Sequence, residues 1–363
     1  MIPSHIISKK RDGKNLSKKE ITWFIKSFLN GTVSDAQMAS LLMTIFYKDM
    51  NEDEIFSLVD IMIKSGSNLK FKNSNNFIAD KHSTGGIGDK ISLILVPILA
   101  SLDIKVPMIA GRALAFTGGT IDKLESIPGY NPYQSIKNFK ELVIKNNCAI
   151  VSQTNEFCPA DKKIYHLRDL TGTIPSNPLI CSSIMSKKIS EGLNGLVLDI
   201  KVGNGAFIKT IEDGRSLAIL MKKIGNYFNL KTDIVFSSMD QPLGNYAGLS
   251  CEIQESITTL SNNGPKDLLE LTFKLGSKIL IQSKKVNNFN KAVELQKSVI
   301  KNGVALKKFK TMIQSQGGDL GKFMDKNKPI FERNIFSNKS GIIKSFNTEK
   351  IGWSLVELGC GYK

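Results

Sequence analysis

The chain has no hydrophobic run long enough to span a bilayer. Its longest apolar stretch, ISLILVPILASL, covers only residues 91–102 and contains Pro97, whereas a transmembrane helix needs about 20 apolar residues. The amino-terminal stretch MIPSHIISKKRDGK also lacks the apolar core of a signal peptide. We therefore predict a cytoplasmic protein with no membrane partner.

Cysteine is scarce and carries no metal-binding spacing. The five cysteines contain no CxxC pair and have no histidine at ligand spacing: Cys148, Cys158, Cys181, Cys251 and Cys360. An odd set of this kind favours reduced thiols over a disulfide framework or a zinc site. We therefore predict no metal ligands.

Acidic residues are also in the minority. The chain has 33 Asp and Glu residues against 49 Lys and Arg residues, which gives a formal net charge of +16. Such a charge is a signal for nucleic acid or an anionic substrate. However, no block of five like charges and no alternation of arginine with aromatic residues occurs. The lysines are spread through almost every segment, as on solvated faces, and we predict no nucleic-acid partner.

The chain does have enough apolar residues, 41% of 363, for one large or two medium domains. Residues 17–66 follow a helical pattern, with a capping box from Ser17 to Glu20 and further helix starts at Ser34 and Asn51. After a polar linker, five short apolar runs alternate with helical segments: FIAD, VPMIAGR, CAIVSQT, GLVLDIKVG and TDIVFSSM. We expect a small all-helical domain plus a larger α/β domain with a mostly parallel sheet.

A helical stretch at residues 160–192 interrupts the α/β pattern between two predicted strands. An insertion of this kind is a natural place for a cleft. We expect residues 1–67 and 160–191 to form the helical domain, and residues 75–159 and 192–363 to form the α/β domain.

The glycine-rich loop DKHSTGGIGDK, residues 80–90, matches neither common nucleotide signature. A Walker loop would need glycine at Asp89, and both the Walker loop and the dinucleotide fingerprint would need a different residue at Ile91. The loop joins a predicted strand to a helix, where backbone N–H groups and the helix dipole favour an anion. Lys81, Ser83 and Ser92 add donors suited to phosphate or sulfate, although an ordinary strand-to-helix turn is the alternative.

A second glycine loop, AGRALAFTGGTIDKLESIPG, covers residues 110–129 and follows one strand–helix unit later. It again places two glycines and a hydroxyl, Thr120, after a predicted strand. Loops at the carboxyl ends of neighbouring parallel strands meet at the ligand-binding edge of a sheet. We therefore expect both loops to contribute to one anion site.

Four motifs closely resemble the thymidine and pyrimidine nucleoside phosphorylases: DKHSTGGIGDK, GRALAFTGGTIDKLESIPG, PADKKIYHLRDLT and SSIMSKKISEGLNGLVLDIKVGNGAF. The stretches KKRDGKNLSKKEI and SDAQMASLLMTIFYKDM are similar to the helical domain of the same family. The resemblance runs over nearly the whole chain. Anthranilate phosphoribosyltransferase shares the general fold, but its glycine loop does not carry the KHS triplet.

This resemblance implies reversible phosphorolysis of a pyrimidine nucleoside, thymidine above all, to free base and sugar 1-phosphate. It implies a homodimer and no cofactor other than the co-substrate phosphate. By match to the phosphate site of the family, the phosphate-binding residues are Lys81, Ser83, Ser92 and Thr120. By match to its pyrimidine site, the base is held by Arg168, Ser183 and Lys187, in a pocket shaped by Tyr165, Leu114 and Ile180.

The chemistry of these residues agrees with such roles. Cleavage of an N-glycosidic bond puts negative charge on the departing pyrimidine, which the cations of Arg168 and Lys187 would stabilise. Ser183 and Lys187 are four residues apart and share a helix face. His82 lies between the two groups and is a candidate for protonating or hydrogen-bonding the pyrimidine. A structural histidine in a tight loop is the alternative.

Four positions bear on activity and specificity. The family usually has Ser where Ala110 stands, and loss of a phosphate donor is worth about 1 to 3 kcal/mol, so we expect a raised phosphate KM. Phe116 replaces a usual His and makes the cleft more apolar. Some bacterial members bind potassium beside the first loop, and the ammonium of Lys90 could supply that charge, unless Lys90 faces solvent. Met108 favours the thymidine-type members, because pyrimidine-general enzymes often have Lys there.

The final stretch, SFNTEKIGWSLVELGCGYK, resembles the middle of the family's carboxyl-terminal domain. We therefore expect the α/β domain to be shortened at its carboxyl end. Three alternatives to a thymidine phosphorylase stay open: a pyrimidine nucleoside phosphorylase of broad specificity, a related phosphoribosyltransferase, and a degenerate binding homologue without turnover. A phosphoribosyltransferase would need acidic residues for magnesium pyrophosphate, and only Asp122 and Glu125 are placed for this.

Overall fold

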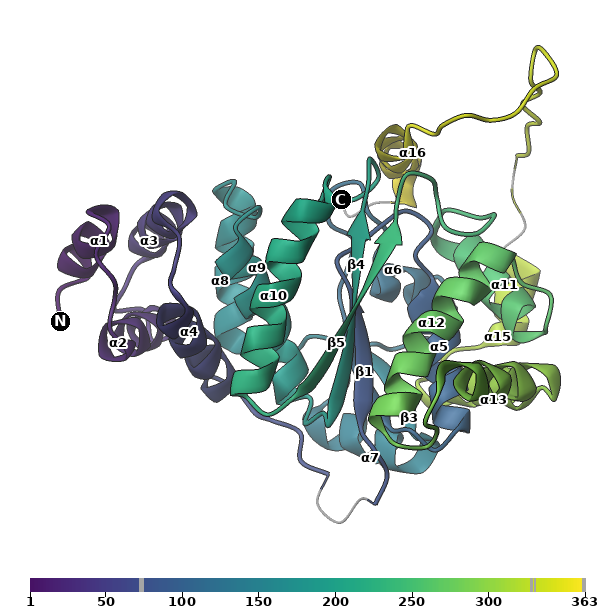
Figure 1. Cartoon of the computed structure of the whole chain (residues 1–363), viewed down its shortest axis with the longest axis horizontal. Helices are drawn as coiled ribbons and strands as arrows, with labels where there is room; N and C mark the ends of the chain where they lie inside the picture. The colour runs from purple at the N-terminus through teal and green to yellow at the C-terminus, as the bar shows by residue number, and fades with distance from the viewer. Residues whose placement is uncertain (72–74, 327–328, 330, 361–363) are drawn as a thin grey trace.

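The computed structural model describes residues 1–71, 75–326, 329 and 331–360. A helical unit lies on one side of an α/β part (Figure 1). The pairs formed by the five described strands are all parallel. The predicted fold class, a small helical domain plus a larger α/β domain with a parallel sheet, is confirmed.

Four helices open the chain: α1 (Pro3–Arg11), α2 (Lys18–Leu29), α3 (Asp35–Lys48) and α4 (Glu52–Lys64). Reciprocal capping boxes start the last three of them, at Ser17 with Glu20, Ser34 with Gln37 and Asn51 with Glu54. The three predicted helix starts are therefore confirmed. Helix α1 is an addition that the sequence pattern did not predict.

The predicted insertion forms the helices α8 (Pro159–Leu170) and α9 (Asn177–Ser190). Both lie between the first four helices and the sheet (Figure 1), with α4 packed on α9 and α3 on α8. One hydrophobic core joins them and includes Phe24, Met38, Val59 and Met185. The chain thus returns to the helical unit between its third and fourth strands.

The strands form two parallel groups. The first has the order β1 (Ala79–Ser83), β4 (Gly195–Val202) and β5 (Lys231–Ser238), and the second pairs β2 (Val106–Ala110) with β3 (Cys148–Ser152). A parallel bridge between Ile78 and Lys105 links the groups. Each of the five predicted apolar runs contributes to one strand, but the ladder between β1 and β2 stops after this bridge.

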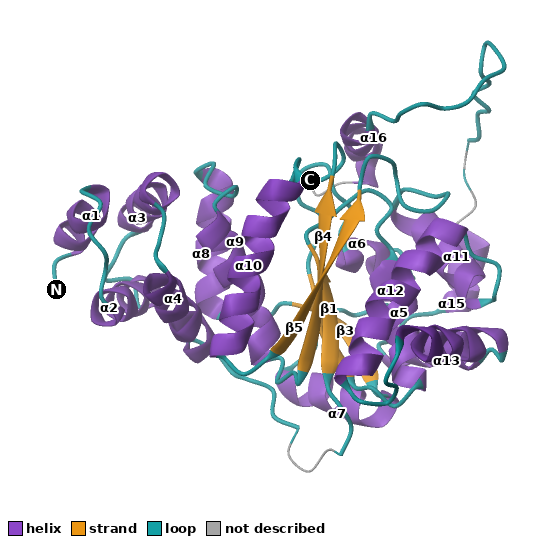
Figure 2. Ribbon diagram, in the orientation of Figure 1, coloured by secondary structure: helices purple, strands orange, loops and turns teal. Residues whose placement is uncertain are grey.

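Helices cover both faces of the strands (Figure 2). Leu196 and Leu198 of β4 pack into the core of the helical unit, whereas Val197 between them packs into the core that holds α5 (Ile91–Ser101), because successive side chains of a strand point to opposite faces. The carboxyl ends of the strands therefore meet at one edge of a layered structure.

The remaining helices are α6 (Thr120–Glu125), α7 (Ile136–Asn146), α10 (Ile211–Tyr227), α11 (Leu249–Leu260), α12 (Lys266–Gln282), α13 (Phe289–Lys301), α14 (Val304–Ser315), α15 (Leu320–Lys326) and α16 (Thr348–Leu355), followed by a π-helical turn, Val356–Cys360. Of the helices that the structure describes, none has the length and apolar character needed to cross a membrane.

Candidate functional site

The first glycine loop leaves the carboxyl end of β1. Lys81 is buried there, with its Nζ 3.6 Å from Asp89 Oδ2 and 4.0 Å from Asp199 Oδ2. The Oγ of Ser83 accepts a hydrogen bond from the N–H of Gly85 at 3.2 Å. Gly85 has a φ of 95°, a conformation that glycine adopts without strain. Lys81 and Ser83 therefore lie at the root of a tight turn.

A second lysine, Lys201 of β4, completes this charge cluster and was missed by the sequence analysis. Its Nζ lies 2.6 Å from Asp199 Oδ2 and 3.7 Å from Asp89 Oδ2. Although burial opposes ionisation, Lys201 and Lys81 hold the pKa of Asp89 well below its usual range. The charged triplet Asp-Ile-Lys inside the buried run GLVLDIKVG was the signal that could have revealed it. Two lysines and two aspartates balance here, so a bound phosphate needs donors from the loop backbone as well.

The second glycine loop contacts the first. A methyl group on Gly85 would lie 3.5 Å from the Oγ1 of Thr117, and Lys123 of α6 donates to the carbonyl of Asp89 at 2.8 Å. Thr120 is the first residue of α6 and Ser92 the second residue of α5, where it is buried. The structure thus brings both loops to one edge of the strands, as predicted. The roles of Ser92 and Thr120 in phosphate binding stay predictions.

Phe116 of the second loop is covered by the carboxyl-terminal helix. Its ring centroid lies 5.2 Å from that of Phe207 and 5.9 Å from that of Trp353 in α16, and the Nζ of Lys209 lies 5.5 Å from its centroid. Gly352 approaches so closely that a methyl group there would lie 2.5 Å from the Phe116 carbonyl oxygen. Phe116 therefore packs the second glycine loop against α16.

The predicted base-binding residues lie on α8 and α9. The Nζ of Lys187 donates to the Oγ of Ser183 at 2.8 Å, one helical turn earlier. The same nitrogen donates to Asp161 Oδ2 at 2.6 Å, a carboxylate that the sequence analysis did not single out. No local pattern marks Asp161, because its partner comes from a different helix. Ser183 and Lys187 therefore share a face, as predicted.

Arg168 is buried beside this pair of helices. Its guanidinium donates to the carbonyls of Ile174 at 2.6 Å and Leu179 at 3.0 Å, and to that of Thr173 at 3.4 Å. Burial lowers the pKa of Arg168. A guanidinium has five N–H donors, so further donors remain for a ligand. In this structure Arg168 supports the turn between the helices, and its contact with a base stays a prediction.

Three residues were expected to shape the base pocket. The ring of Tyr165 lies 5.7 Å from the guanidinium carbon of Arg168, and burial raises the pKa of Tyr165 to about 12. Ile180 packs partly against the core of the helical unit. Leu114 lies on the second glycine loop, where its carbonyl accepts from the N–H of Thr117 at 3.0 Å. The three come from three elements, and their shared role stays a prediction.

His82 lies in β1, between Lys81 and Ser83 in the sequence. It is half-buried, and burial lowers its pKa well below the usual value, with Lys188, Lys187 and Lys81 lowering it further. Lys187 belongs to the predicted base-binding group and Lys81 to the predicted phosphate-binding group, so charges from both groups lower the pKa of His82. The imidazole is therefore neutral at neutral pH and can donate one N–H.

Lys188 links helix α9 to the strands that precede the two glycine loops. Its Nζ donates to Asp80 Oδ2 at 2.5 Å, to Glu191 Oε1 at 2.7 Å and to the carbonyl of Ile109 at 3.0 Å. All of these atoms are buried, and burial raises the pKa of Glu191. One ammonium group thus ties α9 to β1 and β2, the strands from which the glycine loops start.

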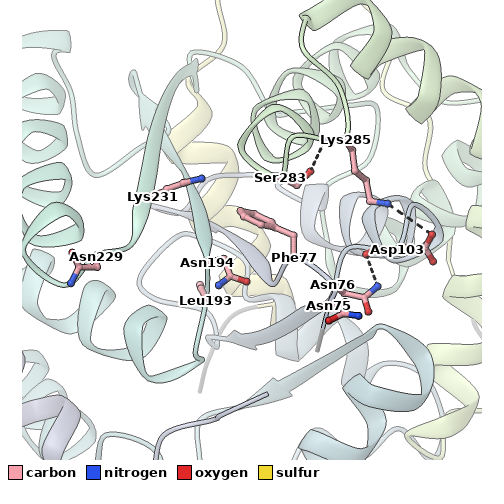
Figure 3. Close-up of a pocket in the computed structure, with 10 residues that line it drawn as sticks. All are labelled: Asn75, Asn76, Phe77, Asp103, Leu193, Asn194, Asn229, Lys231, Ser283 and Lys285. Atoms are coloured by element: carbon pink, nitrogen blue, oxygen red, sulfur yellow. Dashed lines mark hydrogen bonds and ion pairs between the residues drawn. The ribbon is translucent and has the colours of Figure 1, made fainter. Parts of the chain in front are cut away.

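A wide hollow of about 680 Å³ lies at the opposite edge of the strands (Figure 3). Asn194 precedes β4 and Lys231 begins β5, and both line this hollow together with Phe77 and Lys285. Ligands of parallel sheets bind at the carboxyl ends of strands, and none of the predicted site residues lines the hollow. The edge formed by the glycine loops and α8–α9 therefore stays the candidate site.

Two family models match this chain. Residues 75–306 match the a/b domain of a glycosyl transferase family, and residues 4–66 match its helical bundle domain. The fold is also similar to that of anthranilate phosphoribosyltransferase from Thermus thermophilus, with a TM-score of 0.68 over 86% of this chain and 99% of that one. At 16% identity, this second likeness concerns the fold alone.

Curated relatives are much closer in sequence. The pyrimidine-nucleoside phosphorylases of Staphylococcus haemolyticus and Staphylococcus epidermidis are each 44% identical over 360 residues, which is 98% of this chain and 83% of theirs. The protein of the same name from Staphylococcus aureus strain N315 is 43% identical over the same span. The chain therefore belongs to the pyrimidine-nucleoside phosphorylase family of glycosyl transferases.

Proposed function

We propose that the protein catalyses the reversible phosphorolysis of pyrimidine nucleosides, with thymidine as its substrate of choice. Phosphate attacks the anomeric carbon, the bond to the ring nitrogen breaks, and the products are the free base and 2-deoxy-α-D-ribose 1-phosphate. The observation that carries this proposal is the buried ion pair between Lys188 of α9 and Asp80 of β1, which brings the helix of Lys187 against the strand of Lys81 and His82.

One group of residues binds the phosphate, and another stabilises the negative charge on the departing base. Lys81, Ser83 and the loop N–H groups hold the attacking phosphate, with Ser92 and Thr120 as further donors. The electron pair of the broken bond goes to the pyrimidine ring, and the cations of Lys187 and Arg168 stabilise that charge. His82, neutral before substrate binds, donates its N–H to a ring oxygen. A purely structural His82 is the alternative.

Phosphate-dependent release of the free base tests the proposal. Purified protein is incubated with thymidine, deoxyuridine and uridine, with and without phosphate, and the released base is separated by chromatography. Thymine released only with phosphate is the expected result. No release from any of the three nucleosides would favour a binding homologue without turnover and would contradict the proposal.

The same assay decides the breadth of specificity. Met108 is buried in β2 and favours thymidine, whereas the name of the Staphylococcus relatives favours a general pyrimidine nucleoside phosphorylase. Release of uracil from uridine as fast as thymine from thymidine would support the broader alternative.

The alternative of a phosphoribosyltransferase is disfavoured, because Asp122 and Glu125, the acidic residues placed to bind magnesium pyrophosphate, are already paired with an arginine. Arg112 donates to Asp122 Oδ1 at 2.6 Å and to both carboxylate oxygens of Glu125 at 2.7 Å. These contacts raise the pKa of Arg112. Both carboxylates are thus already hydrogen-bonded to one guanidinium.

The protonation state of His82 predicts the pH profile. Because burial and three lysines lower its pKa, the imidazole takes up a proton only well below the usual value of about 6.5. We expect kcat/KM for thymidine to show no inflection from His82 between about pH 6 and pH 8. An inflection near neutrality that disappears in His82→Asn would contradict this. His82→Ala with unchanged turnover would remove the catalytic role itself.

We also propose that Lys90 replaces the potassium ion of some bacterial relatives. Lys90 is fully buried, and its Nζ donates to the carbonyls of Leu243 at 2.9 Å and Tyr246 at 2.7 Å and to the carboxylate of Glu255. An ammonium group has three donors, and all three are used. Lys90 therefore does not face solvent, and its charge occupies the space among oxygen atoms that would suit a cation.

Independence from potassium is the expected result. The wild-type rate should be equal in potassium chloride and in choline chloride at the same ionic strength, because the cation is covalently attached. In Lys90→Ser the carbonyls and Glu255 lose their cation, and we expect added potassium to restore activity. A wild-type enzyme that needs potassium would overturn the proposal.

Ala110→Ser is expected to lower the phosphate KM about fivefold, the effect of one hydrogen bond of about 1 kcal/mol. Ala110 is the half-buried last residue of β2, next to the second loop. Ala115→Ser, at an exposed position of the same loop, is the matched control and should leave the phosphate KM unchanged. Equal KM values in wild type and Ala110→Ser would remove the argument.

We propose, finally, that the protein is a homodimer formed through the helical unit. Two exposed apolar side chains of α3 support this surface, Met43 at 37% and Tyr47 at 77% exposure. Light scattering of the purified protein should give twice the chain mass of 40.1 kDa. A monomer at micromolar concentration would contradict this proposal.

A further inference from the structure

The carboxylate of Asp161 is buried at the base side of the site. Asp161 lies in the first turn of α8, where the helix dipole favours a negative charge. Its side chain is 2% exposed, and its Oδ2 lies 2.6 Å from the Nζ of Lys187, whose side chain is 16% exposed. A buried acid thus meets a lysine that reaches the open side of the site.

Lys187 is held by two hydrogen-bond acceptors, one a charged carboxylate and the other a neutral hydroxyl. Its Nζ donates to Asp161 Oδ2 and to the Oγ of Ser183 at 2.8 Å. Since an ammonium has three donors, one N–H remains for a ligand. Ser183 alone holds this flexible four-carbon side chain less firmly, because a neutral hydroxyl attracts an ammonium less strongly than a carboxylate does.

Asp161 is itself placed by a rigid turn. Cys158 caps α8 with a φ of 44°, an unusual conformation for a residue with a side chain. Its Sγ lies 3.1 Å from the Oγ of Ser190 on α9, and Gln153 donates to the carbonyl of Phe157 at 3.0 Å. These contacts join the start of α8 to α9 and to the end of β3, so the carboxylate cannot move away from Lys187.

In the part of the chain that the structure describes, the second carboxylate oxygen of Asp161 does not contribute a hydrogen bond to the fold. Among the residues that the structure describes, Asp161 Oδ1 is buried and has no hydrogen-bond partner. An unpaired buried oxygen is destabilising, so packing alone does not explain a carboxylate at this position. The arrangement is explained if the negative charge is retained for its effect on Lys187.

We propose that Asp161 is a positioning residue for catalysis: its carboxylate fixes the Lys187 ammonium so that the remaining N–H points at the departing pyrimidine. This inference rests on the proposed function. The carboxylate does not touch the substrate, and it acts only through the lysine. Asp161 therefore matters for charge that develops in the transition state and not for binding of phosphate.

The test is a double-mutant cycle with Asp161→Asn and Lys187→Met. Asp161→Asn keeps the shape and removes the charge, and we expect kcat for thymidine to fall about 100-fold, the effect of misplacing a catalytic group by about 1 Å. In the Lys187→Met background the same substitution should change kcat by less than about twofold, because coupled residues are not additive. The phosphate KM should be unchanged. Asp169→Asn, exposed on the same helix, is the matched control.

The leaving group supplies a second readout. In 5-fluoro-2′-deoxyuridine the fluorine stabilises the pyrimidine anion, so Asp161→Asn should reduce kcat less for this substrate than for thymidine. A purely structural role would reduce both rates equally and would multiply with Lys187→Met, and either outcome would overturn the inference. If Asp161→Asn does not fold, Asp161→Glu shifts the carboxylate by one methylene and enters the same cycle. An inactive wild type, by contrast, would refute the proposed function itself.

Discussion

Lys90→Met is expected to lower the free energy of unfolding by about 3 to 5 kcal/mol, because it leaves a buried carboxylate without its cation. Lys90 is fully buried against Glu255, which is 2% exposed, and also binds the carbonyls of Leu243 and Tyr246. The substitution removes the cation from these three acceptors, and among the described residues the carboxylate keeps only the backbone N–H groups of Asn245 and Tyr246 as donors. Urea denaturation followed by circular dichroism measures the loss.

Two further variants separate charge from packing. Lys266→Met breaks an ion pair with Glu270 whose side chains are 89% and 66% exposed, and it should cost at most about 1 kcal/mol. Lys90→Met combined with Glu255→Gln removes both buried charges and should recover part of the loss, since the desolvation penalty of the carboxylate disappears. If Lys90→Met were as stable as Lys266→Met, the buried pair would not support the loop.

Lys187→Met is expected to lower kcat for thymidine about 10²- to 10³-fold, the usual effect of removing one preorganised donor from a developing anion. Methionine keeps most of the volume of the side chain and removes the charge that, in the proposed function, stabilises the pyrimidine. It also leaves the buried Asp161 without its ion pair, so the folded fraction of the variant is measured alongside its rate. The phosphate residues lie on other elements, so the phosphate KM should stay within about twofold. Steady-state rates at varied thymidine and phosphate concentrations measure both values.

The matched control for this variant is Lys162→Met. Lys162 is exposed on α8 and donates to the Oδ1 of Asn155 at 2.8 Å. Wild-type kinetics are expected there, because the charge lies on the solvent side of the helix. A Lys187→Met enzyme with the same kinetics as Lys162→Met would show that Lys187 does not act on the leaving group.

The parts of the fold that depend on neighbouring residues were predictable from the sequence. A capping box spans four residues, so the starts of α2, α3 and α4 could be predicted. Helix α1 lacks a capping side chain at Ile2. It is held instead by the buried pair between Lys10 and Glu54 at 2.8 Å, and a contact across 44 residues leaves no local pattern.

The same limit applies to the site. Lys187 and Lys188 are adjacent and identical in the sequence, yet the first reaches the open site and the second is 1% exposed among Asp80, Glu191 and the Ile109 carbonyl. Their difference comes from the direction in which each side chain leaves α9. The prediction that lysines occupy solvated faces therefore fails for Lys188 and Lys201. Asp80 lies 108 residues from Lys188 in the sequence, whereas Asp199 lies only two residues from Lys201 and pairs with it inside a buried strand.

The contact between Gly352 and the carbonyl of Phe116 has a consequence for synthesis. The strands β1, β4 and β5 end at residue 238, whereas the second loop is packed by a helix that begins at Thr348. On the ribosome, these strands can emerge long before α16 does. The second loop thus gains its last contact late, and termination between α15 and α16 would leave this loop uncovered.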